Sequence, residues 1–177
     1  VPSNATWETF TASNYSITYV NGTLTIAKAD QTITFGSLSA KTYGDSSFAL
    51  TGTSSSGLGL TYSSSDTNVA TVSGSTVTIV GAGSTTITAS QSGDGNHNAA
   101  TSVDQVLTIN KKSLTITGLS AENKTFDGTT AATLTGAPSL VGVVGTDDVS
   151  LTGTPTATFA SSSVGHAIAV TVSGYSL

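Results

Sequence analysis

The sequence predicts an all-β fold, made of β-sandwich modules that follow one another end to end. Short runs of alternating apolar and polar residues recur along the chain between clusters of Gly, Asn, Asp and Ser, a pattern typical of strands and turns. Residues 29–110 show no 3.6-residue period that would indicate a helix. A long stretch of sequence also occurs twice, which indicates a chain of related modules.

This repeat covers Leu24 to Asp45 and again Leu107 to Gly128. Leu24 maps to Leu107 and Lys28 to Lys111, and the offset of 83 holds without a gap. Each copy contains a strand, a short joint with Lys, a second strand and a turn around Gly and Asp. Because 83 residues is the length of a small domain and longer than a solenoid repeat, the repeat marks junctions between separate modules.

The first module boundary falls at residue 28. Alternating residues from Tyr15 to Ile26 flank Asn21-Gly22, and Asn-Gly between two such runs is the strongest short signal for a hairpin. A two-stranded hairpin is marginally stable alone. We therefore expect residues 1–28 to be the closing hairpin of an upstream domain.

Residues 29–110 are predicted to form a sandwich of two antiparallel sheets. The expected strands are Gln31–Phe35, Phe48–Thr51, Leu60–Ser63, Ala70–Val72, Thr76–Val80, Thr85–Ser90 and Val103–Ile109. Alternation predicts these inward-facing residues: Ile33, Phe35, Leu50, Leu60, Tyr62, Val69, Val72, Val77, Ile79, Ile87, Ala89, Val106, Leu107 and Ile109.

Residues 111–177 are predicted to form a further β module. Its expected strands are Leu114–Thr117, Ala131–Thr135, Val149–Thr152, Ala157–Ala160 and Ala167–Val172. This module is shorter than the repeat step of 83 residues. We expect it to be C-terminally incomplete, so that exposed sheet edges at both ends of the chain pair with strands from outside it.

Three parts of the chain resemble known families. The stretch that begins KTYGDSSFALTG at Lys41 resembles bacterial immunoglobulin-like repeats. The segments NKTFDGTTAATLTG, GTDDVSLTGTPTATFAS and VTVSGYSL are similar to the YDG domain, whose aromatic-Asp-Gly turn is here Phe126, Asp127 and Gly128. The opening NYSITYVNGTLTIAKA is similar to the tail of the mostly-bacterial glycine-rich (MBG) domain. Together the resemblances imply tandem immunoglobulin-like modules in a large bacterial cell-surface adhesin.

Composition narrows the function. Charged residues are 8% of the chain, against about 25% in ordinary domains, while apolar residues are 37%, so the chain is expected to fold with a polar, weakly charged surface. A net charge of -5, with five Lys and no Arg, argues against nucleic acid. The absence of Cys excludes disulfides and thiolate metal sites. No apolar run approaches the roughly 18 residues of a membrane helix, so we expect no membrane insertion.

Few residues are candidates for chemistry. Asp147 and Asp148 form the sharpest acidic pair and are a weak candidate for calcium, which takes 6 to 8 oxygen ligands. The alternative is that they cap a turn before a strand. His97, within the loop Gly93–Asn98, and His166 fall in different modules without a ligand partner at suitable spacing, and are interpreted as loop residues. We expect no catalytic residue, cofactor or metal requirement for folding.

The combined prediction is a non-enzymatic stalk segment of an extracellular bacterial surface adhesin or filament. Its partners would be neighbouring repeats of the same polypeptide, and other copies through exposed strand edges. Short joints at Lys28-Ala29 and Lys111-Lys112 predict modules placed end to end with little interface. The alternative is a glycan-binding module that uses Trp7, Tyr15, Tyr19 or the loop Gly93–Asn98.

Overall fold

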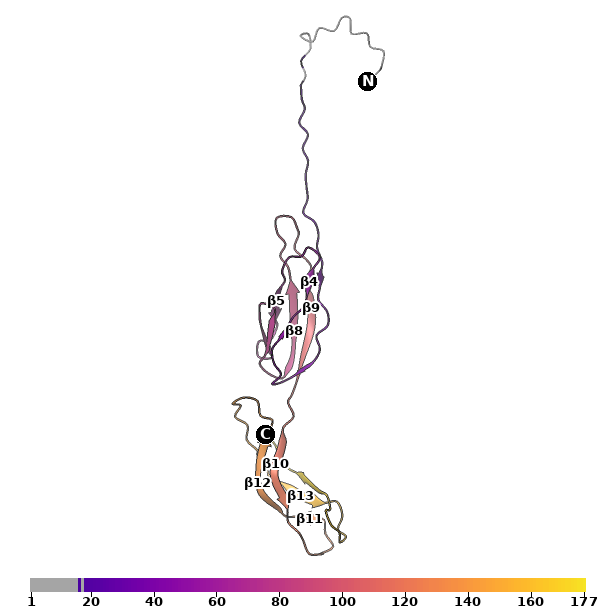
Figure 1. The fold of residues 1–177 in the computed structure, drawn as a ribbon, viewed down its shortest axis with the longest axis vertical. Helices are drawn as coiled ribbons and strands as arrows, with labels where there is room; N and C mark the ends of the chain where they lie inside the picture. Colours follow the sequence, from indigo (N-terminus) through magenta and orange to yellow (C-terminus); the bar gives the residue numbers. More distant parts are fainter. Residues whose placement is uncertain (1–15, 17) are drawn as a thin grey trace.

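The computed structural model describes residue 16 and residues 18–177, and every regular element in this range is a β-strand. The predicted all-β fold is therefore confirmed. The strands form two groups that follow one another along the long axis of the molecule (Figure 1). We call residues 29–110 the central segment, residues 111–177 the C-terminal segment, and residues 18–28 the N-terminal segment. No helix in the described range is long and apolar enough to span a membrane.

The central segment contains nine strands. Their bounds are β1 (Ile33–Thr34), β2 (Lys41–Thr42), β3 (Phe48–Ala49), β4 (Thr53–Ser54), β5 (Thr61–Ser64), β6 (Ala70–Ser73), β7 (Thr76–Ile79), β8 (Gly83–Ser90) and β9 (Val103–Asn110). Each of the seven predicted strands overlaps one of these. The prediction missed β2 and β4, which have two residues each and lack an alternating pattern.

Most strands of the central segment lie in two sheets. One has the order β2-β9-β8-β5 and the other β3-β7-β6, while β1 pairs with β4. The prediction of purely antiparallel sheets was wrong at one place, because β2 runs parallel to β9 with Lys41 beside Ile109. Both strands run toward the C-terminal segment. At that end the Tyr43 N–H donates to the Asn110 carbonyl at 2.9 Å and extends the parallel pairing.

The core lies between these two sheets, because it takes residues from both. Val77 comes from β7, Ile87 from β8 and Leu107 from β9, and all three are fully buried. Phe35 packs against Tyr62 with ring centroids 5.4 Å apart. The predicted inward set is correct except for Val106, which is 59% exposed. Successive side chains on a strand point to opposite faces, so Val106 faces outward once Leu107 is inside.

The C-terminal segment contains five strands in two smaller sheets. They are β10 (Thr115–Ala121), β11 (Ala131–Ala132), β12 (Leu134–Val141), β13 (Thr156–Phe159) and β14 (Val170–Ser173). β10 pairs with β12, and the other sheet has the order β11-β13-β14. The predicted strand Val149–Thr152 does not form. Only Thr152 makes a ladder contact, an isolated bridge to Ser176, and the left-handed Gly153 (φ 95°) follows it directly.

Apolar side chains in the C-terminal segment are far less covered than those of the central segment. Ala157 is its buried apolar residue, whereas Val141 is 54% exposed and Val172 is 38% exposed. β10 and β12 also slip in register at a bulge between Thr117 and Leu119. Gly118 and Gly136 face each other there with positive φ, and a Cβ on either would collide with backbone of the opposite strand.

The repeat found in the sequence recurs in the strands. Adding 83 to the bounds of β3 gives residues 131–132, which are β11. The same shift places β1 within β10 and β4 within β12, and both pairs are antiparallel. It also places Ile87–Ser90, the second half of β8, on β14. Pairing beyond these elements differs, because β8 pairs with β5 whereas β14 pairs with β13.

The N-terminal segment forms no strand in the described range. Tyr19, Leu24 and Ile26 are each at least 84% exposed, and residues 18–28 extend away from the central segment (Figure 1). Among the described residues no strand pairing occurs across Asn21-Gly22. The first residues of the predicted hairpin, and residues 1–15 of the predicted closing segment, lie outside the described range, so the upstream domain stays a prediction.

Candidate functional site

The central and C-terminal segments meet at a joint built from a tight turn. Tyr43 follows β2 directly, and the turn is closed by the Asp45 N–H donating to the Thr42 carbonyl at 2.9 Å. The Asp45 carboxylate accepts from the Thr42 N–H at 2.9 Å. Because the Tyr43 N–H is bonded to the end of β9, this turn holds the phenol ring beside the start of the C-terminal segment.

A hydrogen bond crosses the joint. The Tyr43 hydroxyl donates to Asp147 Oδ2 at 2.9 Å, and Asp147 lies in a turn closed by its N–H to the Val144 carbonyl at 3.1 Å. This bond to the carboxylate raises the pKa of Tyr43 above its ordinary value, and desolvation and the negative charge of Asp147 add to the effect. The joint thus favours the neutral phenol.

An apolar contact lies beside this hydrogen bond. It surrounds a hollow of about 180 Å³ lined by Tyr43, Ala82, Lys111, Lys112, Leu114, Gly142, Val143, Val144, Asp147, Val149 and Leu177. Gly44 has φ 92°, and a Cβ there would lie 2.7 Å from Val144 Cγ2. The glycine therefore permits both the turn and the close approach of the two segments. The contact brings Gly44 and Val144 together beside the Tyr43–Asp147 bond. Little interface between the modules stays a prediction.

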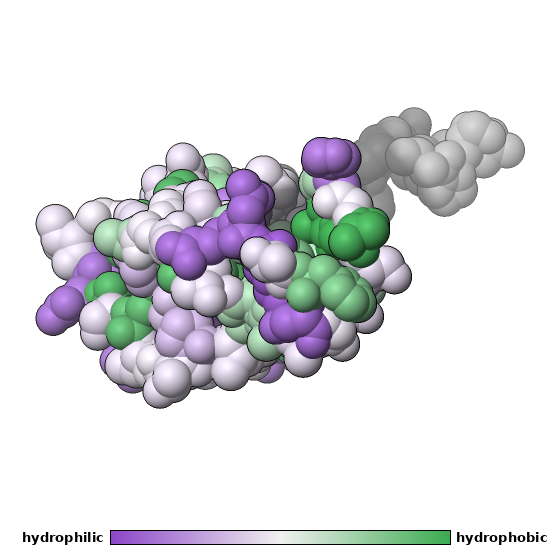
Figure 2. All heavy atoms as spheres, turned by 90° about the horizontal axis from the view of Figure 1, so that it is seen from below, coloured by the Kyte–Doolittle hydropathy of each residue, from purple (hydrophilic) through white to green (hydrophobic). Residues whose placement is uncertain are grey.

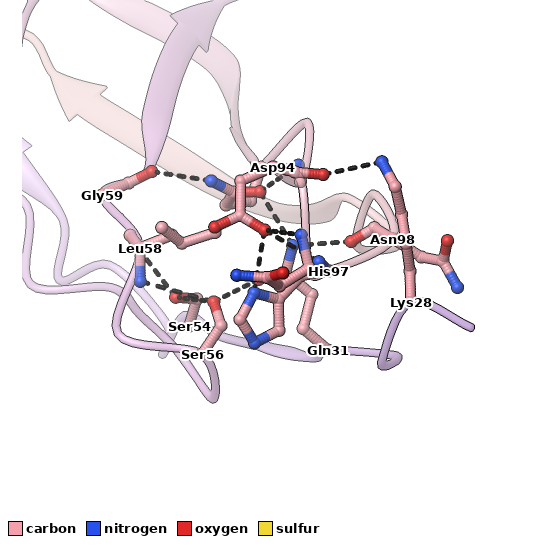
Figure 3. A network of polar contacts seen from close by, with 12 residues as sticks. Lys28, Gln31, Ser54, Ser56, Leu58, Gly59, Asp94, His97 and Asn98 are labelled. Carbon is pink, nitrogen blue, oxygen red and sulfur yellow. Dashed lines mark hydrogen bonds and ion pairs between the residues drawn. The ribbon is translucent and has the colours of Figure 1, made fainter. Parts of the chain in front are cut away.

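The opposite end of the central segment is tied together by a polar network around Gln31 (Figure 3). The Gln31 amide donates to Gln91 Oε1 at 2.8 Å and to the Asn98 carbonyl at 2.7 Å, and its oxygen accepts from Ser56. Lys28 Nζ donates to the Asp94 carbonyl at 2.6 Å. Gln31 is 7% exposed, so these bonds satisfy a buried amide. The network fixes where the N-terminal segment leaves the central segment.

The loop Gly93–Asn98 belongs to this network. Asp94 Oδ1 accepts the N–H groups of Asn96 and His97 at 2.8 and 2.7 Å and meets His97 Nδ1 at 2.9 Å. These bonds, led by the one from Asn96, lower the pKa of Asp94. His97 is thus a partner of Asp94 within its own loop, as its interpretation as a loop residue requires.

An ion pair between Lys124 and Asp127 closes the aromatic-Asp-Gly turn of the C-terminal segment. Lys124 Nζ lies 2.8 Å from Asp127 Oδ1 and donates to the carbonyls of Thr129 and Ala131 at 3.1 and 3.0 Å. The Thr129 N–H donates to the same carboxylate oxygen at 2.9 Å. The bond to Lys124, followed by those to Thr129, lowers the pKa of Asp127 to about 2. Phe126 is 65% exposed next to them.

Repeat-equivalent residues take different partners in the two turns. Tyr43 corresponds to Phe126 and Lys41 to Lys124 at the offset of 83. Lys124 has a carboxylate partner because Asp127 stands where the first copy has Gly44. Lys41 instead lies over the ring of Phe48, with Nζ 5.0 Å from the centroid.

A larger hollow of about 540 Å³ lies beside the aromatic-Asp-Gly turn. Its lining includes Phe126, Asp127, Phe159, His166, Ile168 and Val170. His166 therefore lies near the Lys124–Asp127 pair, a neighbourhood that its sequence position did not indicate. Viewed from this end, the molecular surface carries apolar patches among weakly polar residues (Figure 2).

The structure places the other predicted candidates as follows. Asp147 and Asp148 are exposed, and no group of three or more His, Cys, Asp or Glu that could hold a metal occurs among the described residues. Tyr19 is 84% exposed in the N-terminal segment. Trp7 and Tyr15 lie outside the described residues. The weak calcium candidate and the glycan alternative both remain predictions.

Sequence reasoning missed the residues that form the joint, namely Tyr43, Gly44 and Val144. The partner of Tyr43, Asp147, is 104 residues away, and its sequence pattern points only to calcium or a turn cap. The available signal was the pairing of Tyr43 with Phe126, because an aromatic residue held at one position of each repeat copy indicates a role at the end of each module.

The comparison with protein families concerns the C-terminal segment, which contains the aromatic-Asp-Gly turn. Residues 110–177 match the YDG domain. This YDG segment covers β10 to β14 and contains the turn of Phe126, Asp127 and Gly128, as the sequence resemblance implied. No curated protein and no solved structure matches the chain.

Proposed function

We propose that this chain is a structural segment of a long, repetitive bacterial surface protein, where it spaces a binding region away from the cell. The observation that carries the proposal is the joint, in which Tyr43 bonds Asp147 and Gly44 packs against Val144. A spacer has to transmit position from one module to the next. In this proposal the short connection, the Tyr43–Asp147 bond and the Gly44–Val144 contact together restrict bending at the joint.

The polar network supports the same proposal at the opposite end of the central segment. Two hydrogen bonds cross the start of this segment: Lys28 Nζ donates to the Asp94 carbonyl, and the Asn98 side-chain amide donates to Asp30 Oδ1 at 2.8 Å. The central segment therefore has defined contacts where the chain enters and where it leaves. The preceding and following parts of a stalk would be held in fixed directions.

Surface chemistry also favours a spacer over an enzyme. We infer an extracellular, non-enzymatic role in which neighbouring repeats are the main partners. The chain has few charged residues, and among the described residues the close charged pairs, Lys124 with Asp127 and His97 with Asp94, each close a local turn or loop. Bacterial immunoglobulin-like and MBG-like neighbours, as the resemblances imply, are typical components of adhesins.

Small-angle X-ray scattering of the full chain at low concentration tests this function. We expect the pair-distance distribution of a rod, with one short cross-sectional peak and a long tail. A compact distribution would contradict the proposal. A glycan array run with the same protein separates the spacer from the glycan-binding alternative, because a spacer predicts no specific binding whereas the alternative predicts selective signals lost on Tyr19→Ala.

A further inference from the structure

The N-terminal segment has the sequence of an inner strand but no sheet. Residues 20–27 correspond to β9 at the repeat offset, with Leu24 equivalent to Leu107 and Ile26 equivalent to Ile109. Leu107 and Ile109 are 0% and 2% exposed, whereas Leu24 and Ile26 are 86% and 87% exposed. The same pattern is therefore buried in one copy of the repeat and fully open in the other.

In the central segment, β9 is inserted between two strands. It pairs antiparallel with β8 from Gly83↔Ile109 to Ala89↔Val103, and parallel with β2. In this ladder Gln105 lies beside Ile87 and Val103 beside Ala89, and both β8 residues are fully buried. A strand of this kind is thus the element that closes the core.

The C-terminal segment shows the complementary arrangement. β14 is equivalent to the second half of β8, because Val170 and Val172 stand where the central segment has Ile87 and Ala89. One edge of β14 pairs with β13, and among the described residues no strand pairs with its other edge. Val172 is 38% exposed where Ala89 is buried. The 540 Å³ hollow reaches this region, because Ile168 and Val170 line it.

We propose that residues 20–24 of one copy add as a strand to the free edge of residues 168–172 in a second copy, which include most of β14, as β9 adds to β8. An unpaired strand edge with uncovered apolar side chains recruits a strand of matching alternation. The register carried over from β8 and β9 places Val20 beside Val172, Thr23 beside Ala169 and Leu24 beside Ile168.

This addition has a defined outcome for assembly. Residues 18–27 lie at the opposite end of the molecule from β14 (Figure 1), so one copy cannot satisfy both surfaces by itself. Contacts between unlike surfaces of identical copies generate open filaments when the rotation does not close. The hydrogen bond of Lys28 to the Asp94 carbonyl keeps the donated strand close to its own central segment. The C-terminal segment of the second copy would therefore lie next to the N-terminal end of the first copy's central segment.

Sedimentation velocity of the full chain over a range of concentrations tests the proposal. We expect oligomers that grow with concentration, and their loss in the double variant Leu24→Asp/Ile26→Asp. The matched control is Thr23→Asp/Thr25→Asp, which adds the same charge on the face equivalent to the exposed Val106 and Thr108, and keeps the oligomers. A wild-type chain that stays monomeric would overturn the proposal, as would equal loss of oligomers in both variants.

Disulfide trapping tests the register, because the chain has no cysteine of its own. Thr23→Cys protein mixed with Ala169→Cys protein should form a mixed disulfide dimer under mild oxidation. Thr23→Cys mixed with Ser139→Cys, which places the thiol on β12, should not. Equal yields in the two mixtures would rule out the stated pairing. Both tests are independent of the spacer proposal, since a rod without assembly would refute only the strand addition.

Discussion

The Tyr43 hydroxyl lies 2.9 Å from Asp147 Oδ2 and joins two groups of strands across 104 residues of sequence. Tyr43 belongs to the turn after β2, and Asp147 belongs to a turn of the YDG segment. Short connections are common in strings of domains, and we expect the bond from this tyrosine to the carboxylate to restrict rotation about the connection as well. This relationship leads to predictions on ionisation and on bending.

The ionisation of Tyr43 reports the bond directly. Its pKa is raised because the neutral phenol donates to Asp147, so we expect it to titrate above its ordinary value of about 10. The stabilisation is present below that value and is lost as the pH rises through the raised pKa. NMR titration of the Tyr43 ring carbon checks this. Asp147→Ala should return the pKa toward 10 and Asp148→Ala should not. A wild-type pKa at or below 10 would contradict the bond.

Gly44 allows the close approach at the joint, and Gly44→Ala tests this role. A left-handed conformation costs a side-chain residue about 1–2 kcal/mol, and here the new Cβ would also lie 2.7 Å from Val144 Cγ2. Gly57→Ala is the matched control, with φ 76° and no heavy atom within 4 Å of its Cβ. Thermal unfolding should show a larger loss for Gly44→Ala. Equal losses would mean that the contact with Val144 has no role.

The aromatic-Asp-Gly turn should be sensitive to acid. The Asp127 pKa is about 2 in the folded chain and about 3.9 when unfolded. The turn's contribution is therefore present above pH 3.9 and is lost as the pH falls through 2. NMR titration of the Asp127 carboxyl should give the low value, and Lys124→Met should raise it. A low value that persists in Lys124→Met would assign the effect to the bonds from Thr129.

The core of the central segment should depend on Leu107. Leu107 is fully buried between the sheets, and truncation of a buried leucine costs about 2–5 kcal/mol, so we expect Leu107→Ala to lower the free energy of unfolding by that amount. Val106→Ala is the neighbouring control, because Val106 is 59% exposed and surface changes are usually within about 0.5 kcal/mol. Urea unfolding gives both values. Similar costs for the two variants would contradict the assigned strand faces.

Calcium is the remaining question at the joint. Asp147 already accepts the hydrogen bond from Tyr43, and no third acidic ligand gathers near it among the described residues. We expect the melting temperature to be the same with calcium and with a chelator. A rise of many degrees in calcium, lost in Asp148→Ala, would restore the calcium site.

The sequence predicted the strands that alternate most clearly. β8 and β9 have eight residues each, and their inward side chains, including Ile87 and Leu107, follow from period two. Short strands such as β2 could not be predicted this way, because Lys41-Thr42 has no apolar pattern and pairs only through distant Ile109 and Asn110. Local pattern does not reveal a partner that tertiary packing supplies.

Two errors have the same origin. Asn21-Gly22 has suitable turn chemistry and Val149–Thr152 alternates, but among the described residues neither segment lies against a sheet on which its apolar side chains could be buried. The joint was harder still to predict. From the sequence, Asp147 is a candidate metal ligand, because sequence alone does not show that Tyr43 approaches it. In physical terms, the strand faces are local properties, whereas the joint depends on how two modules meet.

The fixed joint is tested most directly by a distance distribution between spin labels on its two sides. Thr71→Cys on β6 and Ser139→Cys on β12 place labels on exposed strand positions away from the joint, in the Leu24→Asp/Ile26→Asp background that prevents the proposed assembly. Pulsed electron–electron double resonance should give one narrow distribution of label-to-label distances. Tyr43→Phe should broaden this distribution, and Gly44→Ala should broaden it more strongly. A broad distribution in the chain that keeps Tyr43 and Gly44 would contradict a fixed joint, and with it the central basis for a spacer.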